Sequence, residues 1–166
     1  MSGEYYCKCY YLTYGLKTIC LRYFNVFGSY QNLESQYSAV IPIFINAILK
    51  NEHPTIYGDG YQTRDFIYID NVVDVNLLVI NTDKADGQVL NVCQGREINL
   101  FELIKIINKI LGVNIEPVFA EPRPGDIKRS CGDTSRIKSI LNYDPKVSLE
   151  EGIKKTIDWY QRKFHH

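Results

Sequence analysis

Two arginines and an aspartate of this 166-residue chain lie in segments rich in glycine and proline, where they could bind an anion. Arg64 follows a glycine-rich turn, and Arg123 shares the short segment Arg123-Pro124-Gly125-Asp126 with Asp126. A guanidinium group matches phosphate oxygens bidentately, and charge-assisted hydrogen bonds of this kind contribute about 1.5–3 kcal/mol each. The Asp126 carboxylate can accept both hydroxyls of a ribose, and the Tyr57 ring can lie flat against a nucleobase. These residue types indicate binding of an anion joined to a ring.

Each of these residues also has a plainer interpretation. An isolated arginine in a loop most often forms a surface salt bridge. Asp70 precedes an apolar helical pattern and is better interpreted as a helix cap than as a ligand. His53 stands between a helix end and a proline, which favours a structural or exposed role over catalysis. From the residues alone, the anion-binding and the structural interpretations both stay open.

Several catalytic and metal-binding motifs are absent from the sequence. It contains no Gly-x-Gly-x-x-Gly phosphate loop, no P-loop and no credible Ser/His/Asp set. Its cysteines are odd in number, and Cys7 and Cys9 have no second Cys/His pair at zinc-ligand spacing. We therefore expect buried, reduced thiols in a cytoplasmic protein rather than a disulfide or a zinc site. The sequence predicts no catalytic residue and no metal ligand.

The charge balance and the hydropathy pattern exclude two classes of partner. Lys+Arg and Asp+Glu number 19 each, which gives no electrostatic reason to expect nucleic acid or an anionic membrane surface. The best apolar run, Ala39–Leu49, is too short to span a bilayer and is interrupted by Pro42 and Asn46. The N-terminus has no basic region followed by an apolar core, so no signal peptide is expected.

Helical and strand patterns alternate along the chain, which predicts an α/β fold in one domain over residues 1–166. Two capping boxes are expected, at Asn99 with Glu102 and at Ser148 with Glu151. Helices are predicted over 3–14, 38–51, 70–79, 99–111, 133–141 and 148–160, the fourth of them ended by Gly112. Strands are predicted over 18–24, 55–57, 64–69, 89–93 and 115–119, and a loop over 25–37. The apolar stripes of these helices are most simply core.

Five short motifs follow one another along the chain. They are Leu21–Gly28, Ala39–Pro42, Ile56–Gly60, Gln62–Asp70 and Arg123–Asp126. In residue type, order and spacing they resemble the NAD-dependent epimerase/dehydratase family of extended short-chain dehydrogenase/reductases, and most closely its members of the UDP-glucose 4-epimerase type. The resemblance covers essentially the whole chain. It implies the C-terminal portion of that architecture, an incomplete Rossmann sheet plus a small mixed α/β substrate-binding domain.

The resemblance assigns residues to a UDP-sugar and to NAD. The residues implied for the UDP-sugar are Asn25, Arg64 and Arg123 at the diphosphate, Val40 and Tyr57 beside the uracil, and Asp126 at the ribose. The residues implied near the nicotinamide end of NAD, in a complete enzyme, are Tyr23, Phe24 and Val26. The interpretation of each residue from its type and position agrees with these roles, although no residue assigns its role without the resemblance.

The chain departs from the family pattern in its cofactor and catalytic motifs. Family members carry a glycine-rich loop and a Tyr-x-x-x-Lys pair before this region, whereas here Tyr5 is followed four residues later by Cys9 and Tyr6 by Tyr10. We therefore expect the UDP-sugar-binding part of an NAD-dependent epimerase that lacks the N-terminal NAD-binding half. Such a chain is predicted not to bind NAD and to be inactive alone.

Three further expectations concern partners and alternatives. In relatives the helix over 3–14 pairs across a dimer, so a homodimer or another self-association is expected, or association with the missing N-terminal half. A nucleotide-sugar 4,6-dehydratase fragment is the alternative within the enzyme class. Outside that class, the chain could be a non-catalytic UDP-sugar-binding or oligomerisation module.

Overall fold

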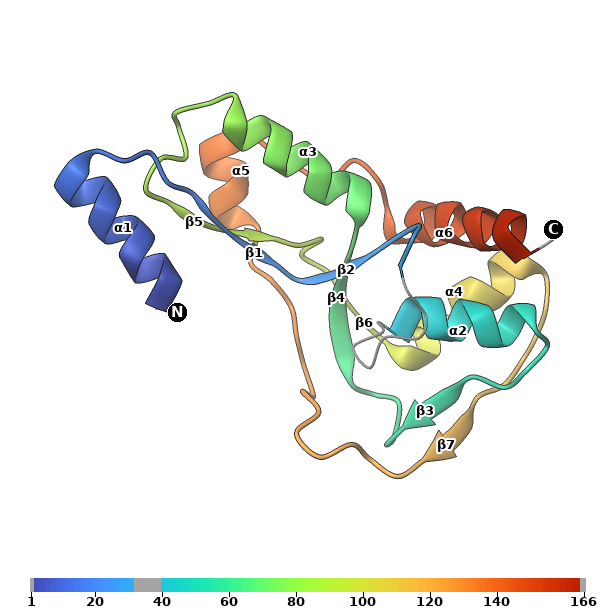
Figure 1. Ribbon diagram of the computed structural model, residues 1–166. Coiled ribbons are helices and arrows are strands. Elements are labelled where there is room, and N and C mark those ends of the chain that lie inside the picture. The colour runs from blue at the N-terminus through green and yellow to red at the C-terminus, as the bar shows by residue number, and fades with distance from the viewer. Residues whose placement is uncertain (1, 32–39, 165–166) are drawn as a thin grey trace.

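The computed structural model describes residues 2–31 and 40–164 and has a mixed α/β architecture, which confirms the predicted fold class (Figure 1). The helices are α1 (Ser2–Tyr14), α2 (Val40–Leu49), α3 (Ile69–Ile80), α4 (Leu100–Leu111), α5 (Ser135–Leu141) and α6 (Leu149–Phe164). The strands are β1 (Cys20–Tyr23), β2 (Asn25–Phe27), β3 (Thr55–Tyr57), β4 (Thr63–Tyr68), β5 (Val89–Val92), β6 (Glu97–Asn99) and β7 (Val118–Ala120). Ser38, the predicted cap of α2, lies outside the described residues.

The strands form three small sheets that link distant parts of the chain. β1 pairs in parallel with β5, with Leu21 opposite Leu90. β4 is the central strand of the second sheet, parallel to β2 and antiparallel to β6. β3 pairs in parallel with β7, with Ile56 opposite Phe119. Parallel pairing requires crossover connections, so each pair brings together segments that are far apart in the sequence.

The larger hydrophobic core lies between α2, α4, α6 and β4, on one side of the molecule in Figure 1. Helix α4 begins at the predicted capping box, in which Asn99 Oδ1 accepts a hydrogen bond from the Glu102 N–H at 2.9 Å and the Glu102 carboxylate accepts from the Asn99 N–H at 3.1 Å. The helix ends at Gly112 in the left-handed conformation, as predicted. Its fully buried face, Leu103 and Ile107, packs into the core.

A smaller core lies beneath α3 and α5, beside β5. Buried side chains from each of these elements meet there, among them Val72, Leu90 and Ile137. Ile69, at the junction of β4 and α3, packs against both cores. The two cores are therefore joined through β4 and the helix that follows it.

Two predicted segments differ in the structure because hydrogen bonds with other elements determine them. Residues 25–27, expected in a loop, form strand β2 because β4 lies alongside. The strand expected from Ile115 begins instead at Val118, because the Asn108 side chain bonds both the C=O (3.0 Å) and the N–H (3.4 Å) of Ile115.

Two of the predicted helix caps are wrong, and a third is half formed. Asp70 lies inside the first turn of α3, and Tyr68 is the N-cap without a side-chain bond, since strand passes directly into helix. Asp133 is not the N-cap of α5, although its carboxylate accepts the Ser135 N–H at 2.8 Å. At α6 the Ser148 hydroxyl accepts the Glu151 N–H at 3.2 Å, while the Glu151 carboxylate pairs with Lys155.

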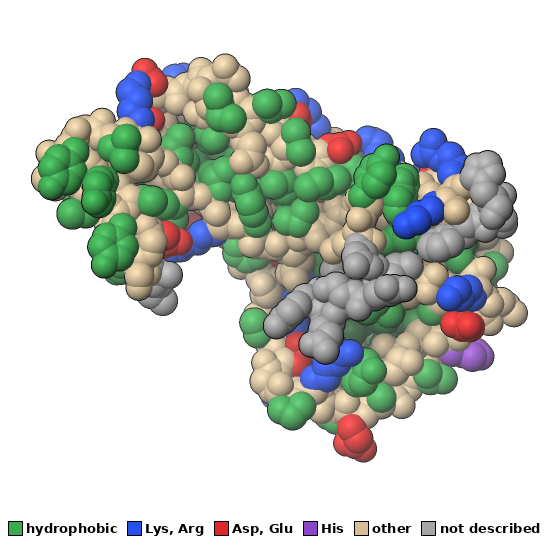
Figure 2. All heavy atoms as spheres, in the orientation of Figure 1, with side chains coloured by type: hydrophobic (Ala, Val, Ile, Leu, Met, Phe, Trp, Pro, Cys, Tyr) green, Lys and Arg blue, Asp and Glu red, His purple; other side chains and the backbone are tan. Residues whose placement is uncertain are grey.

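Helix α1 stands at one end of the molecule and buries none of its residues (Figure 1). Its apolar stripe was expected to be core, and this expectation is wrong. Tyr5 and Tyr6 are 72% and 68% exposed, and hydrophobic side chains are visible at this end in Figure 2. Only Cys93 among the cysteines is buried, whereas Cys9 is among the exposed ones, so the expected burial of thiols is also largely wrong.

None of the helices formed by the described residues has the length and apolar character needed to cross a membrane. Residues 2–31 and 40–164 also hold no group of three or more His, Cys, Asp or Glu side chains placed to bind a metal ion.

Candidate functional site

A pocket of about 460 Å³ lies among α2, the end of β3, the start of β4 and the segment that follows β7. This volume is in the range of small-molecule sites. Leu100 at the start of α4 also lines the pocket, and the predicted site residues in the lining are Val40, Tyr57, Arg64, Arg123 and Asp126. A neighbouring hollow of about 530 Å³ shares Tyr57, Arg123 and Asp126 with it.

The β3–β7 pair carries Tyr57 to the segment that holds Arg123 and Asp126. Tyr57 pairs with Ala120, and the Gly58 N–H donates to the Ala120 carbonyl at 3.0 Å. Gly58 has a φ of +86°, in the left-handed region that favours glycine, so the chain turns there directly after the strand. Because side chains alternate along a strand, Ile56 is buried and Tyr57 points outward into the pocket wall.

Arg64 joins the start of β4 to the segment after β7, which both line the pocket. Its guanidinium donates to the Asp126 carboxylate, to the Ile127 carbonyl and, at 2.8 Å, to the Thr63 carbonyl. The Arg64 side chain is only 16% exposed, so solvent screens this ion pair less than it would on an open surface. The Thr63 N–H also donates to the Lys128 carbonyl at 2.9 Å. The start of β4 therefore holds the 126–128 segment in place while Arg64 faces the pocket.

Arg123 lies over the ring of Tyr57, with its guanidinium carbon 3.9 Å from the ring centroid. This is a cation–π contact, and it occupies one face of the ring that was expected to lie against a nucleobase. A guanidinium stacked through its plane keeps the N–H groups at its edge directed outward. Arg123 can therefore stack on Tyr57 and bind an anion at the same time.

Gln62 is a pocket residue that was not among the predicted site residues. Its Nε2 donates to the Tyr57 carbonyl at 2.7 Å and lies 3.4 Å from Asp126 Oδ2. Its Oε1 is buried without a hydrogen-bond partner among the described residues. Its place as the first residue of the Gln62–Asp70 motif, two residues before Arg64, was the only signal in the sequence.

Asn25 and the residues assigned to the nicotinamide end lie outside this pocket. Asn25 of β2 pairs with Phe66 of β4. Because every second side chain of a strand points to the same side, Asn25 lies on the same face of the sheet as Arg64, but it does not line the pocket. The Tyr23 hydroxyl donates to Asn76 Oδ1 at 3.0 Å, and the Phe24 N–H donates to the Val92 carbonyl at 3.1 Å. Val26 packs against the smaller core.

Asp65, the next residue after Arg64, is a fully buried carboxylate on the opposite face of β4. It accepts backbone N–H bonds from Gln94 at 2.8 Å and from Gly95 and Gly132 at 3.0 Å each. Burial raises the pKa of Asp65 above its ordinary value, and the three N–H groups oppose that shift. Asp65 thus fastens the far end of the 121–132 segment, whose near end carries the pocket residues.

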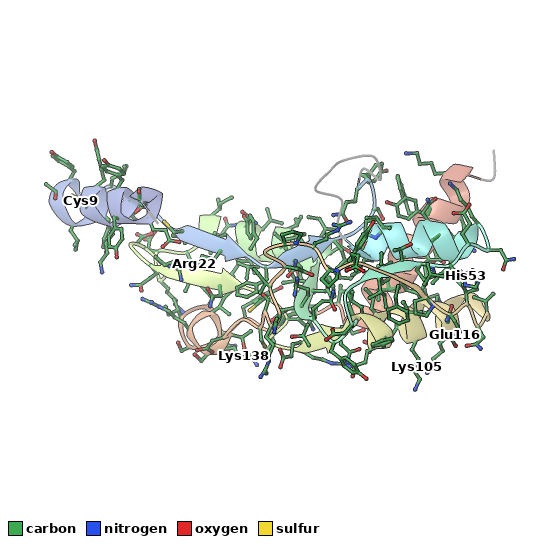
Figure 3. All side chains as sticks on the ribbon, turned by 90° about the horizontal axis from the view of Figure 1, so that it is seen from below. Cys9, Arg22, His53, Lys105, Glu116 and Lys138 are labelled. Atoms are coloured by element: carbon green, nitrogen blue, oxygen red, sulfur yellow. The ribbon has the colours of Figure 1, made fainter. Side chains whose placement is uncertain are left out.

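His53 lies at the rim of the pocket, where its Nδ1 is 2.7 Å from the Glu116 carbonyl (Figure 3). The side chain is exposed. This contact between the end of α2 and the approach to β7 agrees with the structural role expected for His53.

The connections that lead into α3, α4 and α5 do not fit a dinucleotide phosphate site. β4 passes into α3, and β6 into α4, with no residue between strand and helix. The connection from β7 to α5 is long and contains only two glycines, Gly125 and Gly132. Because a dinucleotide pyrophosphate needs a short glycine-rich turn at a helix N-terminus, none of these three connections offers such a cradle.

Solved structures of nucleotide-sugar epimerases share this fold. A UDP-glucose 4-epimerase from Thermotoga maritima, solved with UDP-glucose, superposes with a TM-score of 0.91 and 38% identity over 98% of this chain and 52% of its own. A UDP-N-acetylglucosamine 4-epimerase from Methanobrevibacter ruminantium was solved in complex with UDP-N-acetylmuramic acid. It superposes with a TM-score of 0.91 and 40% identity, over 98% of this chain and 52% of its own. Solved epimerases from Bacillus cereus and Thermus thermophilus contain NAD.

Sequence comparison identifies the same group of proteins. The UDP-glucose 4-epimerase of Mycolicibacterium smegmatis is 35% identical over 163 residues, which cover 98% of this chain and 51% of that protein. The chain thus spans about half the length of the curated relatives it matches. The model of the NAD dependent epimerase/dehydratase family matches residues 1–93, which is more than half of the chain. The chain belongs to the NAD-dependent epimerase/dehydratase family.

Proposed function

We propose that this chain is the UDP-sugar-binding part of a nucleotide-sugar 4-epimerase and that it holds the diphosphate of the ligand between Arg64 and Arg123. The observation that carries the proposal is the convergence of two arginines, an aspartate and a tyrosine from separate segments on one pocket. Two guanidinium groups at one pocket offer N–H donors to the oxygens of both phosphates of a diphosphate. The UDP-sugars bound by two of the solved relatives support the same class of ligand.

The two arginines have different roles in this proposal. Arg64 is fixed by the Asp126 carboxylate and two carbonyls, so it offers a preorganised charge with little further loss of side-chain entropy. Arg123 is exposed and rests on Tyr57, so its edge can follow the phosphates as the ligand enters. Asn25, on the sheet face that Arg64 shares, would reach the diphosphate from the margin of the pocket.

The remaining site residues account for the nucleoside. Val40 on α2 and Tyr57 on β3 stand on different walls of the pocket, where they would flank the uracil. Asp126 Oδ1 is bonded to Arg64, while Oδ2 has only the 3.4 Å approach of Gln62, so this oxygen retains capacity for ribose hydroxyls. A ligand with both hydroxyls should therefore bind more tightly than one without the 2′-hydroxyl.

Calorimetric titration of the purified chain tests this proposal. UDP and UDP-glucose should bind, dTDP should bind more weakly than UDP, and Asp126→Asn should reduce the difference between UDP and dTDP. A chain that binds none of these nucleotides would refute the proposal. Preference for dTDP over UDP would instead favour the 4,6-dehydratase alternative.

From the same proposal we expect that the chain has no epimerase activity on its own. Epimerisation through NAD needs the nicotinamide held against the sugar and a base on the sugar hydroxyl. The sequence has neither a glycine-rich phosphate loop nor a Tyr-x-x-x-Lys pair. Chain incubated with UDP-glucose and NAD should form no UDP-galactose, and NAD should give no calorimetric binding signal. Turnover by the purified chain would contradict this part of the proposal.

A further inference from the structure

Two thiols lie side by side away from the pocket, where α1 passes β1. Burial and, after it, the neighbouring Cys7 thiol raise the pKa of Cys20. Other contacts bracket them: the Thr18 hydroxyl donates to the Cys7 carbonyl at 3.0 Å, and Arg22 donates twice to the Glu4 carboxylate, at 2.7 Å each. Both thiols are free and half-buried. The proximity thus follows from how the helix lies along the strand.

The helix that carries Cys7 has few other attachments. It buries none of its residues, and the Arg22–Glu4 ion pair is on the surface. Nearer the end of α1, the Tyr11 ring packs closely against Gly87, and a Cβ added at Gly87 would stand 2.3 Å from the ring. A covalent link between helix and strand would therefore change how firmly α1 is held.

We propose that Cys7 and Cys20 are a redox-sensitive dithiol, which a small-molecule disulfide converts into an intramolecular disulfide that fixes α1 to β1. In the first step one thiolate attacks the small disulfide, forms a mixed disulfide and releases one thiol. In the second step the other thiolate attacks the protein sulfur of that mixed disulfide and releases the second thiol. The protein loses two electrons and two protons, and the small disulfide gains them as two thiols.

Cys9 is a matched control on the same helix. It is exposed, and its sulfur lies 3.9 Å from the Thr13 hydroxyl. Two residues on a helix are separated by about 200° of rotation, so Cys9 faces away from the side that carries Cys7. Figure 3 shows Cys9 on α1 and Arg22 on β1. Cys9 should therefore form only a mixed disulfide under the same conditions.

Trypsin separates the three thiols, which makes the linkage directly measurable. Cleavage after Lys8, Lys17 and Arg22 places Cys7 in peptide 1–8, Cys9 in peptide 9–17 and Cys20 in peptide 18–22. The chain is incubated with oxidised glutathione, its remaining thiols are alkylated, and the unreduced digest is analysed by mass spectrometry. The linked pair 1–8/18–22 should exceed 9–17/18–22 by about tenfold or more, since neighbouring thiols have a high effective concentration.

Variants and a second readout complete the test. Cys9→Ser should leave the yield of the linked 1–8/18–22 pair unchanged. In Cys20→Ser, oxidised glutathione should leave Cys7 as a glutathione adduct, because the second thiol is missing. Amide exchange in α1 should slow after oxidation and recover after reduction with dithiothreitol. Glutathione adducts on Cys7 and Cys20 without the linked pair would overturn the proposal, as would an equal yield of the 9–17/18–22 pair.

Discussion

Gly152 in α6 allows the closest approach of that helix to strands β2 and β4. A Cβ added at Gly152 would stand 2.8 Å from Tyr68 Cδ2, 2.9 Å from Tyr68 Cβ and 2.9 Å from Phe27 Cζ. Real Cβ atoms essentially never come within 3.0 Å of such neighbours, so Gly152→Ala must displace two buried aromatic side chains. The position is buried inside the larger core, which has little room to relax.

Two opposing effects set the size of the change. Replacing glycine by alanine inside a helix stabilises it by about 1 kcal/mol, whereas overpacking a core costs about 1–3 kcal/mol. With three contacts below 3.0 Å, overpacking should prevail, and Gly152→Ala should lower the free energy of unfolding by about 1–2 kcal/mol. For a chain of this size that corresponds to a Tm lower by roughly 2–8 °C.

Gly3→Ala is the matched control for this measurement. Gly3 also lies in a helix, but an added Cβ would meet nothing within 4 Å. The control should leave Tm unchanged or raise it slightly. Both variants are melted at one protein concentration and followed by circular dichroism. If Gly152→Ala melts at or above the wild-type temperature, the reasoning about close packing between α6 and the strands is wrong.

Other expectations follow from buried polar groups and from the exposed helix. Asp65→Asn replaces one acceptor oxygen by an NH₂ group and should cost about 1–3 kcal/mol at pH 7, because one backbone N–H loses its partner. Burial raises the pKa of Asp65 from 3.8, so the folded state retains a proton that the unfolded chain releases. Protonation of Asp65 therefore stabilises the folded state. This stabilisation is complete below pH 3.8 and is lost as pH rises through the raised pKa. The Asn variant should lack that component in urea melts across pH, and an unchanged pH profile would contradict the assignment. Asn108→Ala leaves the Ile115 backbone without the two hydrogen bonds of the Asn108 side chain and should lower the free energy of unfolding by about 1–3 kcal/mol. Urea melts should show this as a lower midpoint, and an unchanged midpoint would contradict the expectation. The exposed tyrosines of α1 should make the chain self-associate; light scattering should then show a lower mass for a Tyr10→Ser/Tyr14→Ser variant, whereas a monomeric wild-type chain would contradict it.

Local signals in the sequence predicted part of this fold well. Thr55–Tyr57 has the predicted bounds, and the Asn99–Glu102 box and Gly112 mark the ends of α4 as expected. The capping box and Gly112 depend on neighbouring residues only, whereas Thr55–Tyr57 also pairs with the distant β7. β2 and β6 were missed because each has only three residues and is defined by its pairing with β4. Strand formation of this kind depends on distant partners more than on intrinsic propensity.

The site shows the same division between local and long-range information. The types of Arg64, Arg123 and Asp126 indicated anion binding, but the family resemblance was needed to assign them to one ligand. The pocket that brings them together arises from the parallel β3–β7 pair, which no local pattern reveals. The contact between Arg123 and Tyr57 follows from that same pairing, and the Arg64–Asp126 ion pair joins β4 to the segment after β7.

The central claim is that Arg123 binds the diphosphate of a UDP-sugar, and the affinity for UDP tests it most directly. Arg123 is exposed and its side chain ties no backbone in place, so Arg123→Gln should leave the free energy of unfolding within about 0.5 kcal/mol of wild type. Arg96, an exposed arginine paired with Glu150 outside the pocket, is the matched control. Isothermal titration with UDP should show about a 10- to 150-fold higher Kd for Arg123→Gln, equivalent to about 1.5–3 kcal/mol, and an unchanged Kd for Arg96→Gln. Equal Kd values for wild type and Arg123→Gln would contradict the account.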